Sequence, residues 1–275
     1  MTSNSPKSSS PWGDMIELAT ESYSSLTHQF RDEDVGAEVA GMVLAGHSQG
    51  KVFVSAQDED RAVFLYNNGF CVLAGSVPNA EFARACLQWL YDYQQQDFFI
   101  LYPNRDCWLP SLNGSKTEST QKLQRIAFEL DRYAFEAHRS ESLPPTGIRI
   151  TPMDAALMRE VEATVYPWIG GTWKSAVDFE ERGFGVCAST DEGVVSLCYS
   201  VFVSHGKHAV DIRTIEKFRR LGLARTVAQS FIAECVQRGV YPTWDCYETN
   251  LSSMRLAQAP GFKRTRQFPV YSWYR

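Results

Sequence analysis

The segment 209–224, AVDIRTIEKFRRLGLA, restricts the possible folds of this chain more than any other. Apolar residues alternate in its first part, which predicts a strand, and Arg219-x-x-Gly222-x-Ala224 follows a short charged turn. The residues that come next recur with helical spacing and predict a helix with one apolar face. The first N–H groups of a helix have no partner within it and lie at the positive end of its dipole. The segment therefore predicts a turn that can hold phosphate groups.

Two other phosphate-binding motifs are excluded. The sequence contains neither Gly-x-x-x-x-Gly-Lys-Ser/Thr nor Gly-x-Gly-x-x-Gly with a following acidic residue. What remains is Arg-x-x-Gly-x-Ala after a strand, with Arg220 and Arg225 adding positive charge. A plain helix start with solvated arginines would match the same pattern, so this motif alone does not establish a phosphate site.

Length and composition limit the class of protein. The chain has 275 residues, of which 44% are hydrophobic and 21% are charged, as in a globular protein with one large or two modest domains. A formal net charge of -5 lacks the basic field that nucleic acids or anionic membranes attract. No apolar run reaches the length of a membrane span. We therefore expect neither nucleic acid nor membrane among the partners.

The N-terminal stretch and the cysteines point to a compartment. Residues 1–14 are polar and rich in serine, which predicts a disordered tail and no signal peptide. The seven cysteines are scattered and form no Cys-x-x-Cys, which predicts reduced thiols in a cytoplasmic protein. The five histidines are equally dispersed, so we expect no metal site.

A change in composition divides the chain. Residues 141–147 contain Ser, Pro and Gly and read as a linker between a smaller α/β domain of unknown role, 15–140, and a second domain, 148–275. In the first domain the patterns predict helices, strands and one loop, while residues 122–137 fit no assignment. The expected helices are 15–30 and 79–93, the strands are 51–56, 62–66, 70–74 and 98–102, and the loop is 108–115.

The second domain resembles the GNAT acyltransferases. Their pyrophosphate loop reads Gln/Arg-x-x-Gly-x-Gly/Ala, and strands and helices alternate over 147–275 in the order of that family. Asn250-x-x-Ser253 followed by Gly261-Phe262 is similar to a further segment of the family. The resemblance is to a subgroup with an additional N-terminal domain. It implies a mixed α/β sheet and a GNAT-like acyl-CoA N-acyltransferase fold.

The resemblance also implies an acetyl-CoA site. The backbones of Ile212, Arg213 and Thr214 would pair with the pantetheine arm like an added strand. Asn250 and Ser253 would lie near the thioester, and Asn250 also fits the N-cap of its own helix. The pyrophosphate would bind the N–H groups of Arg219, Arg220, Leu221, Gly222, Leu223, Ala224 and Arg225.

The sequence does not decide which residues act as the catalytic acid and base. The tyrosine with which the family often protonates the leaving thiolate falls at Ala257, so this role is empty or belongs to Tyr247, Cys246 or a water. Asp211 and Glu248 are the candidate bases, with Asp211 ranked first because the family often has a strand-four glutamate there. Each carboxylate could also be a plain surface charge or one half of an ion pair.

We expect an acetyl-CoA-dependent N-acetyltransferase in which an acceptor amine attacks the thioester directly. A small-molecule amine is favoured over a protein. The first domain would cover or shape the acceptor site or form a homodimer, and Trp168 and Trp173 line an acceptor pocket or pack in the core. The alternative is a non-catalytic acyl-CoA sensor or interaction module, suggested by Ala257. A third possibility, a degenerate GNAT half that binds no CoA, conflicts with the intact Arg-x-x-Gly-x-Ala.

Overall fold

The computed structural model describes residues 13, 15–56, 61–93, 97–138 and 145–275. The expected tail 1–14, apart from Gly13, lies outside the described residues, and so do residues 141–144 of the expected linker. Within the described ranges, no helix is both long enough and apolar enough to cross a membrane.

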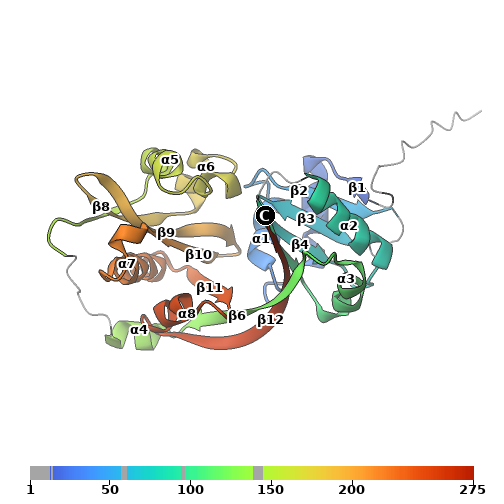
Figure 1. The fold of residues 1–275 in the computed structure, drawn as a ribbon. Helices are drawn as coiled ribbons and strands as arrows, with labels where there is room; N and C mark the ends of the chain where they lie inside the picture. Colours follow the sequence, from blue (N-terminus) through green and yellow to red (C-terminus); the bar gives the residue numbers. More distant parts are fainter. Residues whose placement is uncertain (1–12, 14, 57–60, 94–96, 139–144) are drawn as a thin grey trace, which may run out of the picture.

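All of the described strands join one mixed sheet, which confirms the expected α/β class (Figure 1). Its 12 strands follow the order β1-β2-β3-β4-β5-β12-β6-β11-β10-β9-β8-β7. The strands are β1 (Met15–Glu17), β2 (Lys51–Ser55), β3 (Val63–Asn67), β4 (Phe70–Ala74), β5 (Phe98–Pro103), β6 (Gln121–Leu130), β7 (Arg149–Pro152), β8 (Gly185–Thr190), β9 (Gly193–Ser204), β10 (Lys207–Thr214), β11 (Tyr241–Tyr247) and β12 (Phe262–Tyr274). The helices are α1 (Ala37–Leu44), α2 (Ala80–Tyr93), α3 (Leu109–Ser115), α4 (Arg132–His138), α5 (Ala155–Thr164), α6 (Ala176–Arg182), α7 (Leu223–Arg238) and α8 (Leu251–Gln258). Short 3₁₀ helices are η1 (Thr20–Gln29), η2 (Asp106–Trp108), η3 (Ile169–Thr172) and η4 (Glu216–Phe218).

One arrangement of strands and a crossover helix occurs twice, once in the first half (15–138) and once in the second half (145–275). In the first half β2, β3 and β4 are antiparallel neighbours, and α2 connects β4 to the parallel strand β5. In the second half β8, β9 and β10 are antiparallel neighbours, and α7 connects β10 to the parallel strand β11. A parallel pair needs such a long crossover, which explains the helix in each half.

The two halves exchange strands at the centre of the sheet. β6 precedes the expected linker, yet it pairs with β11 and β12 of the second half. β12 in turn pairs with β5 of the first half. Figure 1 shows β6 and β12 as long strands that run side by side between the halves. The domain division at 141–147 stays a prediction, and the structure adds that the halves share these strands.

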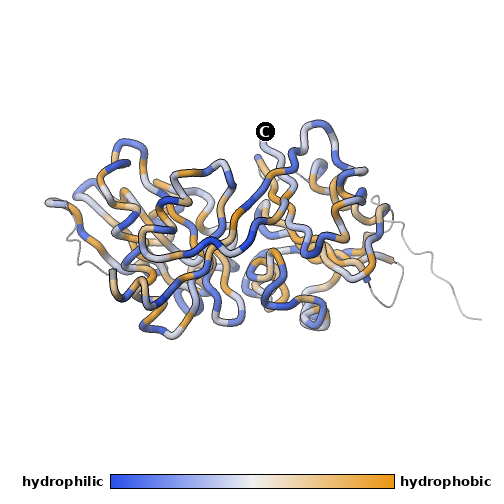
Figure 2. The backbone as a smooth tube through the Cα atoms, turned by 90° about the horizontal axis from the view of Figure 1, so that it is seen from below, coloured by the Kyte–Doolittle hydropathy of each residue, from blue (hydrophilic) through white to orange (hydrophobic). Residues whose placement is uncertain are grey.

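The hydrophobic core also crosses between the halves. Its largest cluster combines Val39 and Val43 of α1 with Val201 and Phe202 of β9. Figure 2 shows apolar (orange) stretches of the chain within both halves, interrupted by hydrophilic (blue) ones. Packing of α1 against β9 therefore fixes the first half on the second, next to the place where β9 turns into β10.

Local signals predicted several elements correctly. Helix α7 buries residues at helical spacing, such as Val227, Phe231 and Ile232, and glycines with positive φ flank it at both ends: Gly222 (φ 80°) and Gly239 (φ 71°). The strands around 67–69 form the expected hairpin, because Asn and Gly at its turn adopt positive φ angles of 50° and 88°.

One expectation about the first half is correct only in part, and another is wrong. Residues 15–30 form β1 and η1, because Met15 is buried in a strand beside β2 and Tyr23 and Leu26 are buried with the three-residue spacing of a 3₁₀ helix. The expected loop 108–115 is helical, since a proline at its first turn starts α3 and Trp108 is buried beneath it. Residues 122–137, left without an assignment, form β6 and α4.

Candidate active site

A cavity of about 1530 Å³ extends from the N-terminus of α7, between β10 and β11, to the first half of the chain. Gly222, Ile212 and Tyr247 line its second-half side, and Glu38 and Phe98 line its first-half side. Because both halves supply walls, one cleft can hold two reactants end to end.

The cleft opens where β10 and β11 separate. The two strands pair in parallel only from Lys207↔Tyr241 to Ala209↔Thr243. After Ala209 the register of β10 with β9 shifts, and from Thr243 onward β11 pairs with β6 on its other side. A shift of this kind bends a strand and releases its neighbour. The inner edges of β10 and β11 beyond Ala209 are therefore available for a ligand with amide groups.

The turn before α7 presents a row of N–H groups. Arg220 has a φ of 65° and Gly222 a φ of 80°, so the chain twists sharply before the helix begins at Leu223. The first helical bond runs from Thr226 N to Gly222 O (3.1 Å), and no side chain caps this end. Among the described residues, no group accepts a hydrogen bond from the N–H groups of 220–225. A non-glycine residue with positive φ and a row of free N–H groups are both typical of anion sites.

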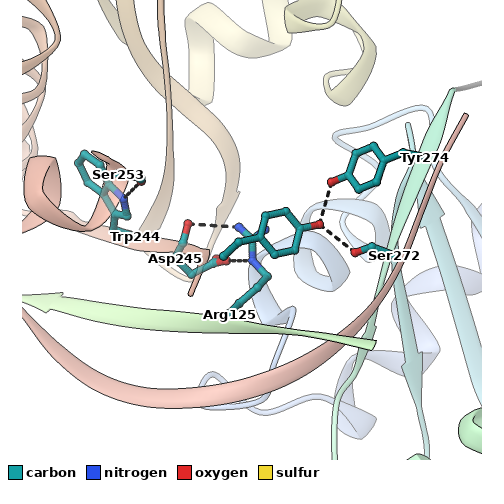
Figure 3. Close-up of polar contacts among 7 residues, drawn as sticks. Arg125, Trp244, Asp245, Ser253, Ser272 and Tyr274 are labelled. Carbon is teal, nitrogen blue, oxygen red and sulfur yellow. Dashed lines mark hydrogen bonds and ion pairs between the residues drawn. The ribbon is translucent and has the colours of Figure 1, made fainter. Parts of the chain in front are cut away.

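Eleven of the twelve expected cofactor residues line this cleft. The exception is Leu221, whose side chain is exposed. Asn250 caps α8 by accepting the N–H of Ser253 (3.1 Å), and Ser253 Oγ accepts from Trp244 Nε1 (3.1 Å; Figure 3). The structure thus brings together the two segments, 212–225 and 250–253, that the sequence places apart.

Asp211 lies at the opening of the strands and is held from three sides. Its Oδ2 accepts the hydroxyls of Tyr166 (2.8 Å) and Tyr199 (3.2 Å), and its Oδ1 accepts the N–H of Ile212 (2.8 Å). Burial, with the nearby Asp211 carboxylate, raises the pKa of both tyrosines, so their hydroxyls keep their protons. The Arg213 guanidinium lies 5.4 Å from the centre of the Tyr166 ring.

The other expected catalytic residues are spread more widely. Glu248 is exposed, accepts from Gln267 Nε2 (3.3 Å) and does not line the cleft. Tyr247 lines the cleft, and burial raises the pKa of the cleft thiol of Cys246. Ala257 is fully buried in α8.

An ion pair between β6 and β11 forms the floor of the cleft (Figure 3). Arg125 Nε contacts a carboxylate oxygen of Asp245, and Arg125 Nη2 donates to the Asp245 carbonyl oxygen (3.2 Å). The guanidinium lies 4.7 Å from the Tyr247 ring centre, and the Tyr247 hydroxyl lies 2.8 Å from both Ser272 Oγ and the Tyr274 hydroxyl. This network ties β6, β11 and β12 together beside the cleft.

Aromatic rings form the wall of the cleft on its first-half side. Trp168 stacks on Phe98 with ring centres 4.1 Å apart, and Phe98 stacks on Tyr274. All three line the cleft, whereas Trp173 is fully buried and donates from Nε1 to the Ser200 carbonyl (3.1 Å). Trp168 therefore lines a pocket and Trp173 packs in the core, which are the two alternatives that the sequence left for these residues.

Several residues of the cleft escaped prediction from the sequence. Glu38 stands in the apolar run of α1, and Asp245 is the only carboxylate in β11. A single charge within a buried element is a signal for both, since such a charge needs a reason to be there. Arg125 carried no such signal, because its strand was not recognised.

Comparison with known proteins gives consistent matches. The sequence model of the GNAT acetyltransferase family matches residues 30–271. The chain is 30% identical over 258 residues to a Bacillus subtilis (strain 168) protein named uncharacterized N-acetyltransferase YdfB, covering 93% of this chain and 97% of that one.

Two solved structures share the fold. A GCN5-related N-acetyltransferase-like protein from Streptococcus suis 89/1591 superposes with a TM-score of 0.71 at 22% identity, covering 92% of this chain and 98% of that one. A tandem GNAT protein from the clavulanic acid biosynthesis pathway superposes with a TM-score of 0.60 at 10% identity, covering 95% and 98%.

Proposed function

The chain belongs to the GNAT acetyltransferase family, and from this membership we propose that it transfers an acetyl group from acetyl-CoA directly to an acceptor amine. One observation supports acetyl-CoA as the donor. A single cleft contains both the free N–H groups before α7 and the separated edges of β10 and β11.

The residues present fit a CoA donor. The N–H groups of 220–225 and the side chains of Arg219, Arg220 and Arg225 suit a pyrophosphate, and a Cβ at Gly222 would meet no atom within 4 Å, so phosphate oxygens have room. The opened edge of β10 suits the pantetheine amides, and the Ile212 N–H, which donates to Asp211 in this structure, would have to exchange that partner to join them. A donor held this way has its thioester near the point where β10 and β11 separate.

Direct transfer needs one proton acceptor and one proton donor. The amine nitrogen attacks the thioester carbonyl carbon, the C–S bond breaks, and the CoA thiolate takes up a proton. We place Asp211 at the reacting end of the cleft, beside the incoming amine, and assign Tyr247 as the hydroxyl that protonates the thiolate. The role of Glu248 as a base stays a prediction, and this residue does not line the cleft.

The acceptor is a small-molecule amine in this proposal, because its end of the cleft lies between the two halves. The rings of Phe98 and Trp168 favour an acceptor with an apolar or aromatic part. The family match alone does not distinguish such acceptors.

Calorimetric titration with acetyl-CoA, CoA and ATP, followed by a screen of primary amines for CoA release, tests the proposal. Selective binding of the two CoA species with turnover of an amine would support it. Binding without turnover of any amine would favour the non-catalytic acyl-CoA module. Absence of binding by a folded protein would overturn the proposal.

One acetyl-CoA is expected to bind per chain, although the strand arrangement occurs twice. In the first half β4 and β5 stay paired from Phe70↔Ile100 to Leu73↔Pro103, so no edge opens there. The N-terminus of α2 is already capped, since Asn79 Oδ1 accepts the N–H of Phe82 (2.9 Å). A calorimetric stoichiometry near one would confirm this expectation, and a value near two would contradict it.

A further inference from the structure

Glu38 is a carboxylate that the first half places at the reacting end of the cleft. It belongs to the first turn of α1, a helix whose other side chains are mostly apolar and buried, including Val39, Met42 and Leu44. Glu38 itself is half-buried and lines the cleft. A charge kept within an apolar helix costs stability unless a partner or a function compensates it.

The carboxylate of Glu38 lies where β10 and β11 separate. Its side chain interacts with that of Thr243, and Thr243 is the last residue of β11 that pairs with β10, opposite Ala209. Lys207 of β10 and Asp245 of β11 are the charged groups of the adjacent strands that act on it, and Asp245 is paired with Arg125 of β6. A donor with its pyrophosphate at the α7 turn extends its thioester toward this point.

Glu38 is better placed than Asp211 to accept a proton. Both oxygens of Asp211 already accept hydrogen bonds, from two tyrosine hydroxyls and one backbone N–H. These bonds occupy three of the roughly four acceptor positions of a carboxylate and hold Asp211 in a fixed orientation. Burial raises the pKa of Glu38, and the charge of Asp245 adds to this rise while Lys207 opposes it. A raised carboxyl pKa brings the group closer to neutral pH, where a general base is most effective.

We propose that Glu38, supplied by the first half, is the general base that takes the proton from the acceptor ammonium. This inference rests on the proposed function. The first proton moves from the ammonium nitrogen to a Glu38 carboxylate oxygen, and the freed lone pair attacks the thioester carbonyl carbon. The C–S bond then breaks, and a separate group gives a proton to the leaving CoA thiolate. The nitrogen loses its second proton as the amide forms, and this proton replaces the one that the separate group gave up. Glu38 then returns its proton to solvent. The first half thus completes the catalytic site that the second half begins.

The test compares Glu38→Gln with wild type and with Glu81→Gln, which removes the same charge from an exposed position on α2 outside the cleft. Probe amines are phenethylamine and butylamine, and acetyl-CoA binding is measured in parallel. Glu38→Gln is expected to lower kcat about 10²- to 10⁴-fold with acetyl-CoA affinity unchanged, which is the usual contribution of a general base. Glu81→Gln is expected to match wild type.

The pH profile separates a catalytic from a structural role. In wild type, kcat/KM should rise with pH as Glu38 ionises, because only the carboxylate can accept a proton. In Glu38→Gln this rise should vanish, and Glu38→Asp should restore it with a lower rate. A Glu38→Gln enzyme with the rate and pH profile of wild type would overturn the role of Glu38 and leave the proposed function intact. If wild type binds acetyl-CoA but acetylates no amine, both proposals are wrong.

Discussion

Replacing Gly222 with aspartate should abolish acetyl-CoA binding while the chain stays folded. A Cβ at this position meets no atom within 4 Å, so the substitution creates no clash in the protein itself. The new carboxylate would face the pyrophosphate and repel it, and the loss of two charge-assisted hydrogen bonds at about 1.5–3 kcal/mol each amounts to about 100-fold or more in affinity. Calorimetry measures the affinity, and circular dichroism checks the fold.

Gly239→Asp is the matched control for this prediction. Gly239 ends the same helix and has a φ of 71° against 80° at Gly222, and a Cβ added there also meets no atom within 4 Å. The control therefore carries the same backbone cost without a carboxylate at the N-terminal turn. Wild-type affinity in Gly222→Asp would show that the turn before α7 does not hold the pyrophosphate.

Replacing Asp245 with alanine should destabilise the fold by about 3 kcal/mol, the lower end of the range for breaking a buried ion pair. The side chain of Arg125 is 12% exposed and would keep its charge without its carboxylate partner, while Asp245 is 35% exposed, which moderates the loss. The Tyr247 and Tyr102 rings, 4.7 and 5.8 Å from the guanidinium, shield it from water. Urea unfolding followed by tryptophan fluorescence measures the free energy of unfolding.

An exposed ion pair gives the comparison. Arg149 and Asp191 lie 2.7 Å apart with side chains 61% and 94% exposed, so Asp191→Ala should cost less than about 1 kcal/mol. Equal costs for Asp191→Ala and Asp245→Ala would mean that the cleft floor is solvated. Replacing both partners, Arg125→Met with Asp245→Leu, should recover most of the stability, because no unpaired charge then remains.

Local sequence patterns predicted the turn before α7 and the helix after it, because each signal lies within one segment. Gly222 and the arginines around it stand in one turn, and the apolar spacing of α7 follows directly. The hairpin at Asn68 and Gly69 was predictable for the same reason. Backbone requirements of this kind are met by residues next to each other, so a single sequence suffices to recognise them.

The rest of the cleft lining depends on contacts between distant segments. Glu38 reaches Thr243 only because α1 packs on β9, and Arg125 reaches Asp245 only because β6 lies beside β11. The pattern of β6 could not predict this pairing, because its partners come from the other half and its buried positions include Ile126 and Phe128 among charged neighbours. Whether such a segment forms a strand depends on partners that are distant in the sequence, and its own composition does not reveal them.

The exchange of β6 and β12 has a consequence for how the protein is made. β6 lies between β12 and β11, and β12 follows every other described strand in the sequence. While the second half is still being synthesised, β5 and β6 of the first half both present unpaired edges, which are templates for pairing with other chains. The arrival of β12 closes both edges at once. A premature stop that removes β12 would therefore leave aggregation-prone edges exposed on both β5 and β6.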